Sequence, residues 1–386
     1  MKKWSLFVTI LLSFLLLLPA CGKSPSEPGD SSSMQETQTP ISLKLDVSQD
    51  EKFDTVYLNM TIEDFLAAGF QFGDSCDVSF SNGLSFEDIP LYNGYYVRPG
   101  DPLVIGYPGY PYIGVTLKNN GLWTQSGLKN GDSGTVTLRE AGKYLDVQET
   151  LNQTYSNDRK DYGDDVTFAN FRALSGGKMK EGFAFRGASP VDNEKNRAAY
   201  VDTLIKENDV RFILDLADSE DDLLGFINEE DFCSDYTKSL VDSGSVALLD
   251  MNADYSADTF KGKLASGLKK MLSAEGKVYI HCLEGKDRTG FVCTLLEALS
   301  GAGYDEMCSD YMKTYENYYR VTPDKKPEAY NAIVDLYFNA FLEYLHGTDN
   351  LEELQKADYV LDAENYLLDA GMTQEEIDAL KALLTE

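Results

Sequence analysis

The chain has 386 residues, enough for two or more domains, and its 43% hydrophobic and 25% charged content is typical of a globular protein. It holds 64 Asp and Glu residues against 34 Lys and Arg residues, for a formal net charge of −30. This acidic excess excludes nucleic acid, and an anionic lipid surface, as a partner of the whole surface. A small basic pocket remains compatible with it.

Residues 1–20 are predicted to be a signal peptide. The cations Lys2 and Lys3 precede an apolar run over residues 4–18, which is short for a membrane-spanning helix. The run ends in Leu-Pro-Ala and Cys21, and this cysteine after a small residue resembles the lipobox of bacterial lipoproteins. The resemblance implies a lipid on Cys21 and a place in the bacterial cell envelope, on the outer side of the cytoplasmic membrane. Plain secretion is the alternative.

Residues 21–40 are rich in Ser, Pro, Gly and acidic residues, which predicts a flexible tether. Residues 41–150 are expected to form a small all-β domain, because alternating stretches at 43–47, 77–80 and 135–138 are separated by turn clusters. The Tyr- and Pro-rich segment from Gly106 to Gly114 is interpreted either as a loop that covers the sheet or as a ligand-binding loop.

Residues 155–386 change to an α/β pattern. Apolar runs at 210–216, 245–249 and 276–281 predict buried strands, with helices between them at 197–206 and 260–272. This order favours a mainly parallel sheet flanked by helices on both faces. After Gly303 the chain is predicted to be almost wholly helical, and the segment from Thr373 to Glu376 matches a capping box that opens the last helix.

The segment after the strand at 276–281 has the pattern of an anion-binding loop. The strand ends at His281, Gly285 lies in the middle of the loop, and a helix is expected to begin near Arg288. Backbone N–H groups and a helix N-terminus at the carboxyl end of a parallel sheet attract anions. The same field favours a nucleophilic thiolate at Cys282, and the planar Arg288 fork suits two oxygens of one tetrahedral anion.

The sequence HCLEGKDRTG over residues 281–290 resembles the HCxxGKDRTG form of the atypical bacterial tyrosine and dual-specificity protein phosphatases, which are cysteine-dependent. A second block, Asn170-Phe171-Arg172 followed by Phe185-Arg186-Gly187, is similar to the opening of that family's catalytic domain. The resemblance implies a cysteine-phosphatase-like α/β fold over residues 155–386, without a metal or another cofactor. Glu284 stands where the family commonly has a small residue.

The resemblance also implies a two-step reaction. Cys282 attacks phosphorus to form a phosphocysteine, which water then hydrolyses. Backbone amides of the loop and Arg288 stabilise the phosphoryl oxygens, and His281 supports the loop. The implied phosphate-binding residues are Leu283, Glu284, Gly285, Lys286 and Thr289.

The general acid has several candidates. Asp287 inside the loop is the first choice, because family members with this motif carry an aspartate there. Asp250 and Asp254 follow a predicted strand and are the alternatives. Asp215 and Asp218 follow another predicted strand.

Three functions remain open from the sequence. The first is a protein-tyrosine or dual-specificity phosphatase with a phosphorylated protein as substrate, and the second a phosphoinositide or inositol-phosphate phosphatase. Arg172 and Arg186 are expected as possible substrate contacts in either case. The third is a surface binding lipoprotein with a vestigial phosphatase domain.

Overall fold

The computed structural model describes residues 41–386, which belong to one compact unit. The predicted signal peptide, the tether and Cys21 lie outside the described residues. Within 41–386, no helix is long and apolar enough to cross a membrane. Two separate sheets organise this part of the chain, each with its own hydrophobic core.

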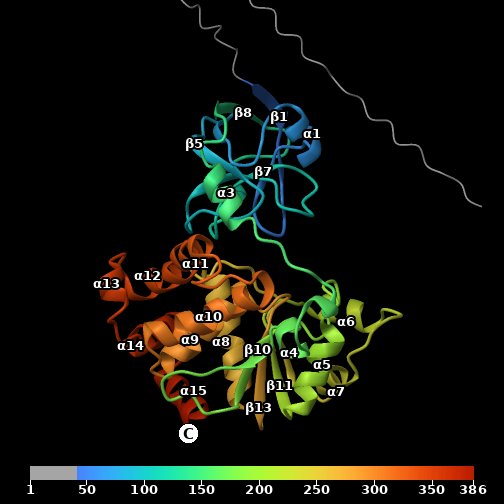
Figure 1. Cartoon of the computed structure of the whole chain (residues 1–386), viewed down its shortest axis with the longest axis vertical. Coiled ribbons are helices and arrows are strands. Elements are labelled where there is room, and N and C mark those ends of the chain that lie inside the picture. The colour runs from blue at the N-terminus through green and yellow to red at the C-terminus, as the bar shows by residue number, and fades with distance from the viewer. Residues whose placement is uncertain (1–40) are drawn as a thin grey trace, which may run out of the picture. The chain divides into compact units, whose positions relative to one another are not determined.

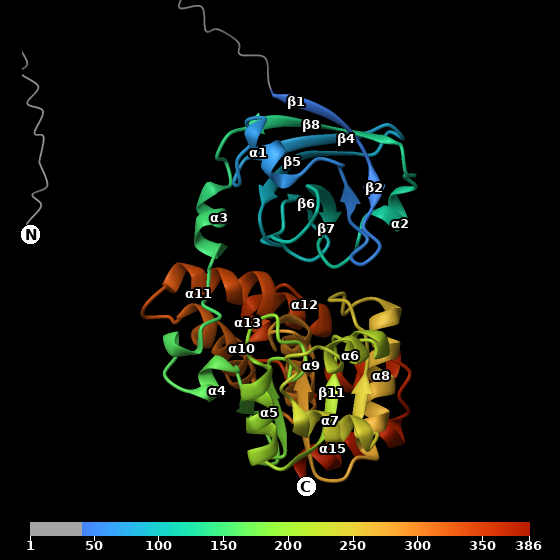
Figure 2. The same ribbon diagram turned by 90° about the vertical axis from the view of Figure 1, so that its right-hand side faces the viewer.

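The first sheet has eight strands in the order β1-β8-β4-β5-β6-β7-β3-β2. Figure 2 shows β1, β8, β4 and β5 side by side. The strands are β1 (Ser42–Asp46), β2 (Ser48–Gln49), β3 (Val56–Tyr57), β4 (Ser75–Phe80), β5 (Ser85–Tyr92), β6 (Pro102–Ile105), β7 (Gly114–Leu117) and β8 (Ser133–Glu140).

This N-terminal part is not purely β. Three short helices, α1 (Ile62–Ala67), α2 (Trp123–Ser126) and α3 (Leu145–Leu151), were not predicted, and β5 pairs with β6 in parallel. Helix α1 starts because the hydroxyl of Thr61 accepts a hydrogen bond from the N–H of Asp64, a regular N-cap. These helices are too short for apolar periodicity to reveal them in the sequence.

The second sheet has five strands in the order β12-β11-β13-β10-β9. They are β9 (Arg172–Ala173), β10 (Ala184–Gly187), β11 (Val210–Asp215), β12 (Val246–Leu248) and β13 (Lys277–His281). All pairings are parallel except that of the edge strand β9 with β10. The predicted strands over 210–216, 245–249 and 276–281 are present, whereas β9 and β10 were not predicted as strands.

Helices cover both faces of this sheet. Helices α8 (Asp258–Leu272) and α9 (Asp287–Leu299) pack on one face, and α5 (Ala198–Glu207) and α7 (Asp235–Asp242) on the other (Figure 1). Smaller helices are η1 (Arg159–Asp161), α4 (Asp165–Phe168) and α6 (Glu220–Ile227). Every residue of α9 from Thr289 to Leu299 is buried, which makes α9 the central helix of the larger core.

The remainder is helical, as predicted. The elements are α10 (Tyr304–Tyr319), α11 (Pro327–Ile333), the π-helix η2 (Val334–Asn339), α12 (Ala340–His346), α13 (Leu351–Leu354), α14 (Val360–Asp369) and α15 (Gln374–Thr385). The predicted capping box is present at the start of α15, where Thr373 and Glu376 exchange hydrogen bonds between side chain and backbone.

The N-terminal part contacts the π-helix η2 and helix α12 through specific polar groups. Arg98 donates to Asp335 at 2.7 Å and to both carboxylate oxygens of Glu343 at 2.9 and 2.7 Å. The buried Lys118 ammonium donates to the carbonyl oxygen of Leu336 at 3.2 Å, and the Tyr337 hydroxyl donates to a carbonyl of the N-terminal part.

Candidate active site

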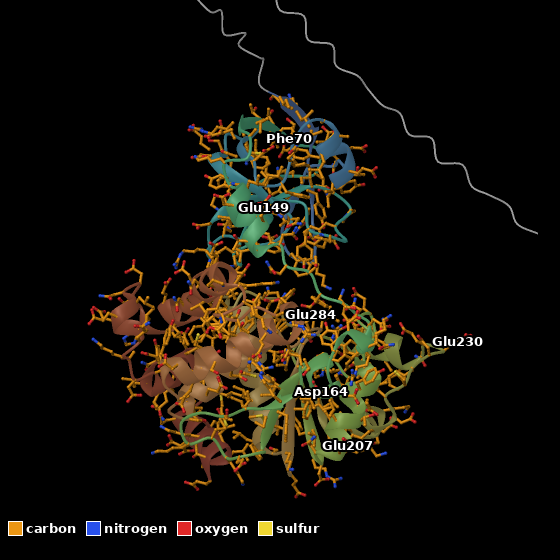
Figure 3. The ribbon with its side chains drawn as sticks, in the orientation of Figure 1. Phe70, Glu149, Asp164, Glu207, Glu230 and Glu284 are labelled. Carbon is orange, nitrogen blue, oxygen red and sulfur yellow. The ribbon has the colours of Figure 1, made fainter. Side chains whose placement is uncertain are left out.

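The loop Cys282–Lys286 connects β13 to α9, at the carboxyl ends of three parallel strands. His281 lies opposite Gly187 of β10 and opposite Asp215 of β11 in the strand register. The chain therefore places the loop at the position where parallel α/β sheets bind ligands. Glu284, at the centre of the loop, is labelled in Figure 3.

Three successive carbonyl groups of the loop, those of Leu283, Glu284 and Gly285, accept hydrogen bonds from other elements. The Leu283 carbonyl accepts from the Ser189 N–H at 3.0 Å. The Glu284 carbonyl accepts from the Tyr318 hydroxyl at 2.9 Å and from the Asn170 amide at 3.2 Å. The same amide reaches the Gly285 carbonyl at 3.3 Å.

These bonds fix the direction of the loop's N–H groups. In a trans peptide the N–H points opposite to the carbonyl, so the N–H groups of Glu284, Gly285 and Lys286 face away from the partners that hold the carbonyls. Within residues 41–386 no acceptor contacts these three N–H groups. Adjacent donors without acceptors form a binding site for an anion.

Gly285 is required for this shape. Its φ of +66° lies in the left-handed region, and a Cβ atom there would lie 2.2 Å from the carbonyl oxygen of Gly187. The loop thus packs directly against the end of β10, backbone against backbone, where only glycine fits.

Cys282 and Arg288 stand at the two ends of the loop. Cys282 is buried, with 3% of its surface exposed. Arg288, in the first turn of α9, is half-buried, and its Nη1 donates to the carbonyl oxygen of Met251 at 2.9 Å. The Thr289 hydroxyl is buried and has no hydrogen-bond partner in the described part of the chain.

Glu284 and Lys286 form an ion pair within the loop, with Nζ and Oε2 3.2 Å apart. The Tyr155 hydroxyl donates to Glu284 as well. Burial acts to raise the pKa of Glu284, but Lys286 and Tyr155 outweigh it and lower this pKa from its ordinary value. Burial opposes the charge of Lys286, yet Asp287 and Glu284 raise its pKa well above the usual range. The pair is therefore ionised, and Glu284 offsets the cation within the loop.

Arg172 and Arg186, expected as possible substrate contacts, are both engaged by an acid of helix α10. Both pair with Asp310 at 2.5 Å, and the side chain of Arg186 is fully buried. Arg186 donates to the Gly285 carbonyl at 3.0 Å. Arg186 thus contacts the loop directly, whereas Arg172 donates to the Asn170 side chain at 2.9 Å. Both are paired with Asp310, an acid of helix α10 that the sequence did not single out.

His281 is a buried ring at the end of β13, next to the loop. Burial lowers its pKa to about 4, and its Nε2 lies 3.8 Å from the Asp215 carboxylate. Burial also raises the pKa of Asp215 and Asp218, that of Asp218 to about 8. One Asp218 oxygen is buried without a partner among residues 41–386. Burial therefore favours the protonated form of this carboxyl.

The other acid candidates differ in how their carboxylates are engaged. Asp287 is exposed at the first position of α9, 3.8 Å from the Lys286 ammonium. Asp250 pairs with Lys263 at 3.0 Å, and Asp254 accepts from the Ser256 hydroxyl at 2.6 Å. Asp287 is thus the least engaged of the three.

Residues 161–386 match the tyrosine phosphatase family. This stretch is more than half of the chain and includes the strand, loop and helix described above, so the chain belongs to the tyrosine phosphatase family. The N-terminal sheet lies outside the matched residues.

No curated protein matches the chain. Among solved structures, it is similar to an uncharacterized conserved protein from Thermotoga maritima, with 17% identity and a TM-score of 0.22. The similarity covers 26% of this chain and 38% of that chain, so the chain spans well under half of that protein.

Proposed function

We propose that the protein hydrolyses phosphomonoesters through a phosphocysteine intermediate. We further propose that its main substrate is phosphotyrosine in proteins, and that a dual-specificity protein phosphatase is the broader alternative with the same chemistry. The observation that carries this proposal is the loop of unpaired N–H groups between Cys282 and Arg288. The loop presents donors to three phosphoryl oxygens, while the thiol is positioned at its start as the attacking atom.

In this mechanism the Cys282 thiolate forms an S–P bond as the bond from phosphorus to the leaving oxygen breaks. An acid protonates that oxygen, and Asp287 is our first candidate because its carboxyl is exposed and least engaged. Water then breaks the S–P bond and returns the thiolate. The free Thr289 hydroxyl is a suitable donor to the departing sulfur. The residues that hold the phosphate supply the positive field, and the mechanism involves no metal.

The test compares Cys282→Ser with the wild type on p-nitrophenyl phosphate in the presence of EDTA. Loss of the nucleophile is expected to lower kcat by at least about three orders of magnitude. Cys233→Ser is the matched control, because Cys233 is an exposed free thiol. Full activity in Cys282→Ser, or no activity in the wild type, would overturn the proposal and favour the vestigial-domain alternative.

Phosphoinositide hydrolysis is the second candidate, and Lys286 is the residue that favours it. A lysine at this place suits a substrate with additional phosphates. The ion pair with Glu284 opposes this function, because it offsets the extra cation. We therefore rank it below protein phosphotyrosine.

We further propose that a lipid on Cys21 anchors the protein to the outer side of the cytoplasmic membrane. The signal-like segment and the lipobox-like ending support this proposal. In a bacterial host, Cys21→Ala is expected to move the protein from the detergent phase to the aqueous phase in a detergent partition assay. Equal partition of both forms would contradict lipidation.

A further inference from the structure

The N-terminal part carries a contiguous group of exposed aromatic side chains, here called the aromatic surface. Phe53, Tyr107 and Tyr112 are exposed by 42%, 41% and 36%, respectively. Tyr57 and Tyr110 lie against them. Single exposed aromatic residues are ordinary, but a joined group of this kind marks an interaction site.

Tyr110 holds the aromatic surface together. Its ring centroid lies 6.1 Å from that of Phe53 and 5.3 Å from that of Tyr107. Tyr57 packs edge-on against both Tyr110 and Tyr112, each at 5.9 Å. The rings come from the β2–β3 and β6–β7 connections and from β3, so the sheet fixes their relative positions.

A row of stacked and hydrogen-bonded tyrosines connects the aromatic surface to the loop Cys282–Lys286. The Lys286 ammonium contacts the Tyr319 hydroxyl at 3.3 Å, and the Tyr319 ring stacks on Tyr315 at 5.8 Å. Tyr315 stacks on Tyr337 of η2 at 6.5 Å.

The row of tyrosines extends to the N-terminal part. The Tyr337 hydroxyl donates to the Tyr95 carbonyl at 3.2 Å. The Tyr95 hydroxyl pairs with that of Tyr110 at 2.7 Å. The aromatic surface and the loop therefore belong to one packed arrangement.

The chemistry of the aromatic surface fits a polypeptide better than a polyanion. Rings and phenol hydroxyls bind apolar side chains and backbone groups of peptides at little conformational cost. A phosphorylated inositol ring needs several cations, whereas Lys286 is offset by Glu284 at 3.2 Å and by Asp287 at 3.8 Å. The net charge of −30 further disfavours a polyanionic ligand.

We propose that the aromatic surface binds the polypeptide segment that flanks the phosphorylated residue, and that it selects substrates with large apolar side chains near the phosphotyrosine. This inference rests on the proposed phosphatase function. It assigns the N-terminal sheet a role in substrate choice, while the loop Cys282–Lys286 with Arg288 performs the hydrolysis.

The test measures kcat/KM on three substrates: p-nitrophenyl phosphate, a short phosphotyrosine peptide with flanking leucines, and a soluble phosphoinositide. The double variant Phe53→Ala/Tyr112→Ala removes two exposed rings that contact no residue of the loop. Its ratio of kcat/KM on the peptide to kcat/KM on p-nitrophenyl phosphate is expected to fall about tenfold. The control Leu361→Ala removes an even more exposed apolar side chain on α14, where 63% of Leu361 is exposed, and should change neither rate.

An unchanged ratio would overturn the inference. A selective loss on the phosphoinositide would overturn it in favour of a lipid substrate. Fluorescence anisotropy with the same peptide and Cys282→Ser, with and without the double variant, measures binding without turnover. If the wild type fails to hydrolyse p-nitrophenyl phosphate, the proposed function fails, while weaker peptide binding by the double variant still supports the docking role.

Discussion

Gly285 and Gly187 touch through their backbones, and this contact sets the shape of the catalytic loop. A Cβ atom on Gly285 would lie 2.2 Å from the Gly187 carbonyl oxygen and 2.4 Å from its carbonyl carbon. Neither backbone can move freely, because β10 pairs with β13 through the residue just before the loop.

Gly285→Ala is expected to disable the loop. The added methyl displaces the loop from β10 and strains a φ of +66°, at a cost of at least about 2 kcal/mol in the free energy of unfolding. Gly225→Ala is the matched control, because a Cβ there, within α6, meets no atom within 4 Å. Turnover of p-nitrophenyl phosphate should fall in Gly285→Ala only. Urea unfolding should show a loss of stability in Gly285→Ala and a gain of about 0.5–1 kcal/mol in Gly225→Ala, where alanine favours the helix. Wild-type turnover in Gly285→Ala would contradict the described packing.

Asp310→Asn is expected to destabilise the protein strongly. Asp310 is the common partner of Arg172 and Arg186, and Arg186 has no exposed side-chain surface. A buried guanidinium left without its counter-charge costs about 3–5 kcal/mol. Asp324→Asn, an exposed acid, should stay within about 0.5 kcal/mol of the wild type. Equal unfolding midpoints in urea for the two variants would refute this role of Asp310.

The raised pKa of Asp218 predicts how the free energy of unfolding changes with pH. Burial raises its pKa to about 8 in the folded protein, whereas an unfolded Asp has a pKa of about 4. The folded state therefore binds the proton more tightly, so this contribution to stability is complete below about pH 4 and is lost as pH rises toward 8. Relative to the wild type, Asp218→Asn should gain stability between pH 5 and pH 8.

Asp222→Asn provides the opposite control. The Ser219 hydroxyl and N–H lower the pKa of Asp222, so its contribution is present at neutral pH and is lost on acidification. The difference in free energy of unfolding between Asp222→Asn and the wild type should stay constant from pH 5 to pH 8. Urea unfolding across this pH range measures both variants. If the difference in free energy of unfolding between Asp218→Asn and the wild type does not change with pH, the raised pKa is disproved.

The general acid can be identified from the alkaline limb of the pH–rate profile. An acid must hold its proton to protonate the leaving oxygen, so its removal flattens that limb. With phosphotyrosine, Asp287→Asn is expected to lower kcat about a hundredfold and to remove the limb. The effect should be smaller with p-nitrophenyl phosphate, whose leaving group needs little protonation. If the alkaline limb is lost in Asp218→Asn and not in Asp287→Asn, Asp218 is the general acid.

The sequence predicted the fold best where a segment is buried on both sides. Strands β11, β12 and β13 are apolar runs and were located within one or two residues. Strand β10 was missed because Arg186 interrupts its apolar pattern, although that arginine is buried by its pairing with Asp310. The short helices of the N-terminal part lack a periodic face, and only their caps mark them.

The candidate site was predictable only where it is local in the chain. Cys282, Gly285 and Arg288 lie within seven residues, and together with the preceding strand and the following apolar helix they indicate an anion loop. The groups that hold the loop come from distant segments, as with Asn170 and Tyr318. Their positions follow from tertiary packing, which a single sequence does not reveal. The signal present in the sequence was the four-residue spacing of Asp310, Thr314 and Tyr318, which places these polar groups on one face of α10.

Helix α10 gives the catalytic loop its rigidity. Asp310, Thr314 and Tyr318 are spaced four residues apart on one face of the helix. Asp310 holds the arginines, Thr314 accepts from the Asn170 amide at 3.1 Å, and Tyr318 donates to the loop itself. The loop is thus shaped before any phosphate arrives, and binding need not reorganise it. A shift of α10 along its axis would misalign all three supports at once. Under the proposed function, the affinity for phosphate would therefore be coupled to the position of a helix that need not touch the substrate.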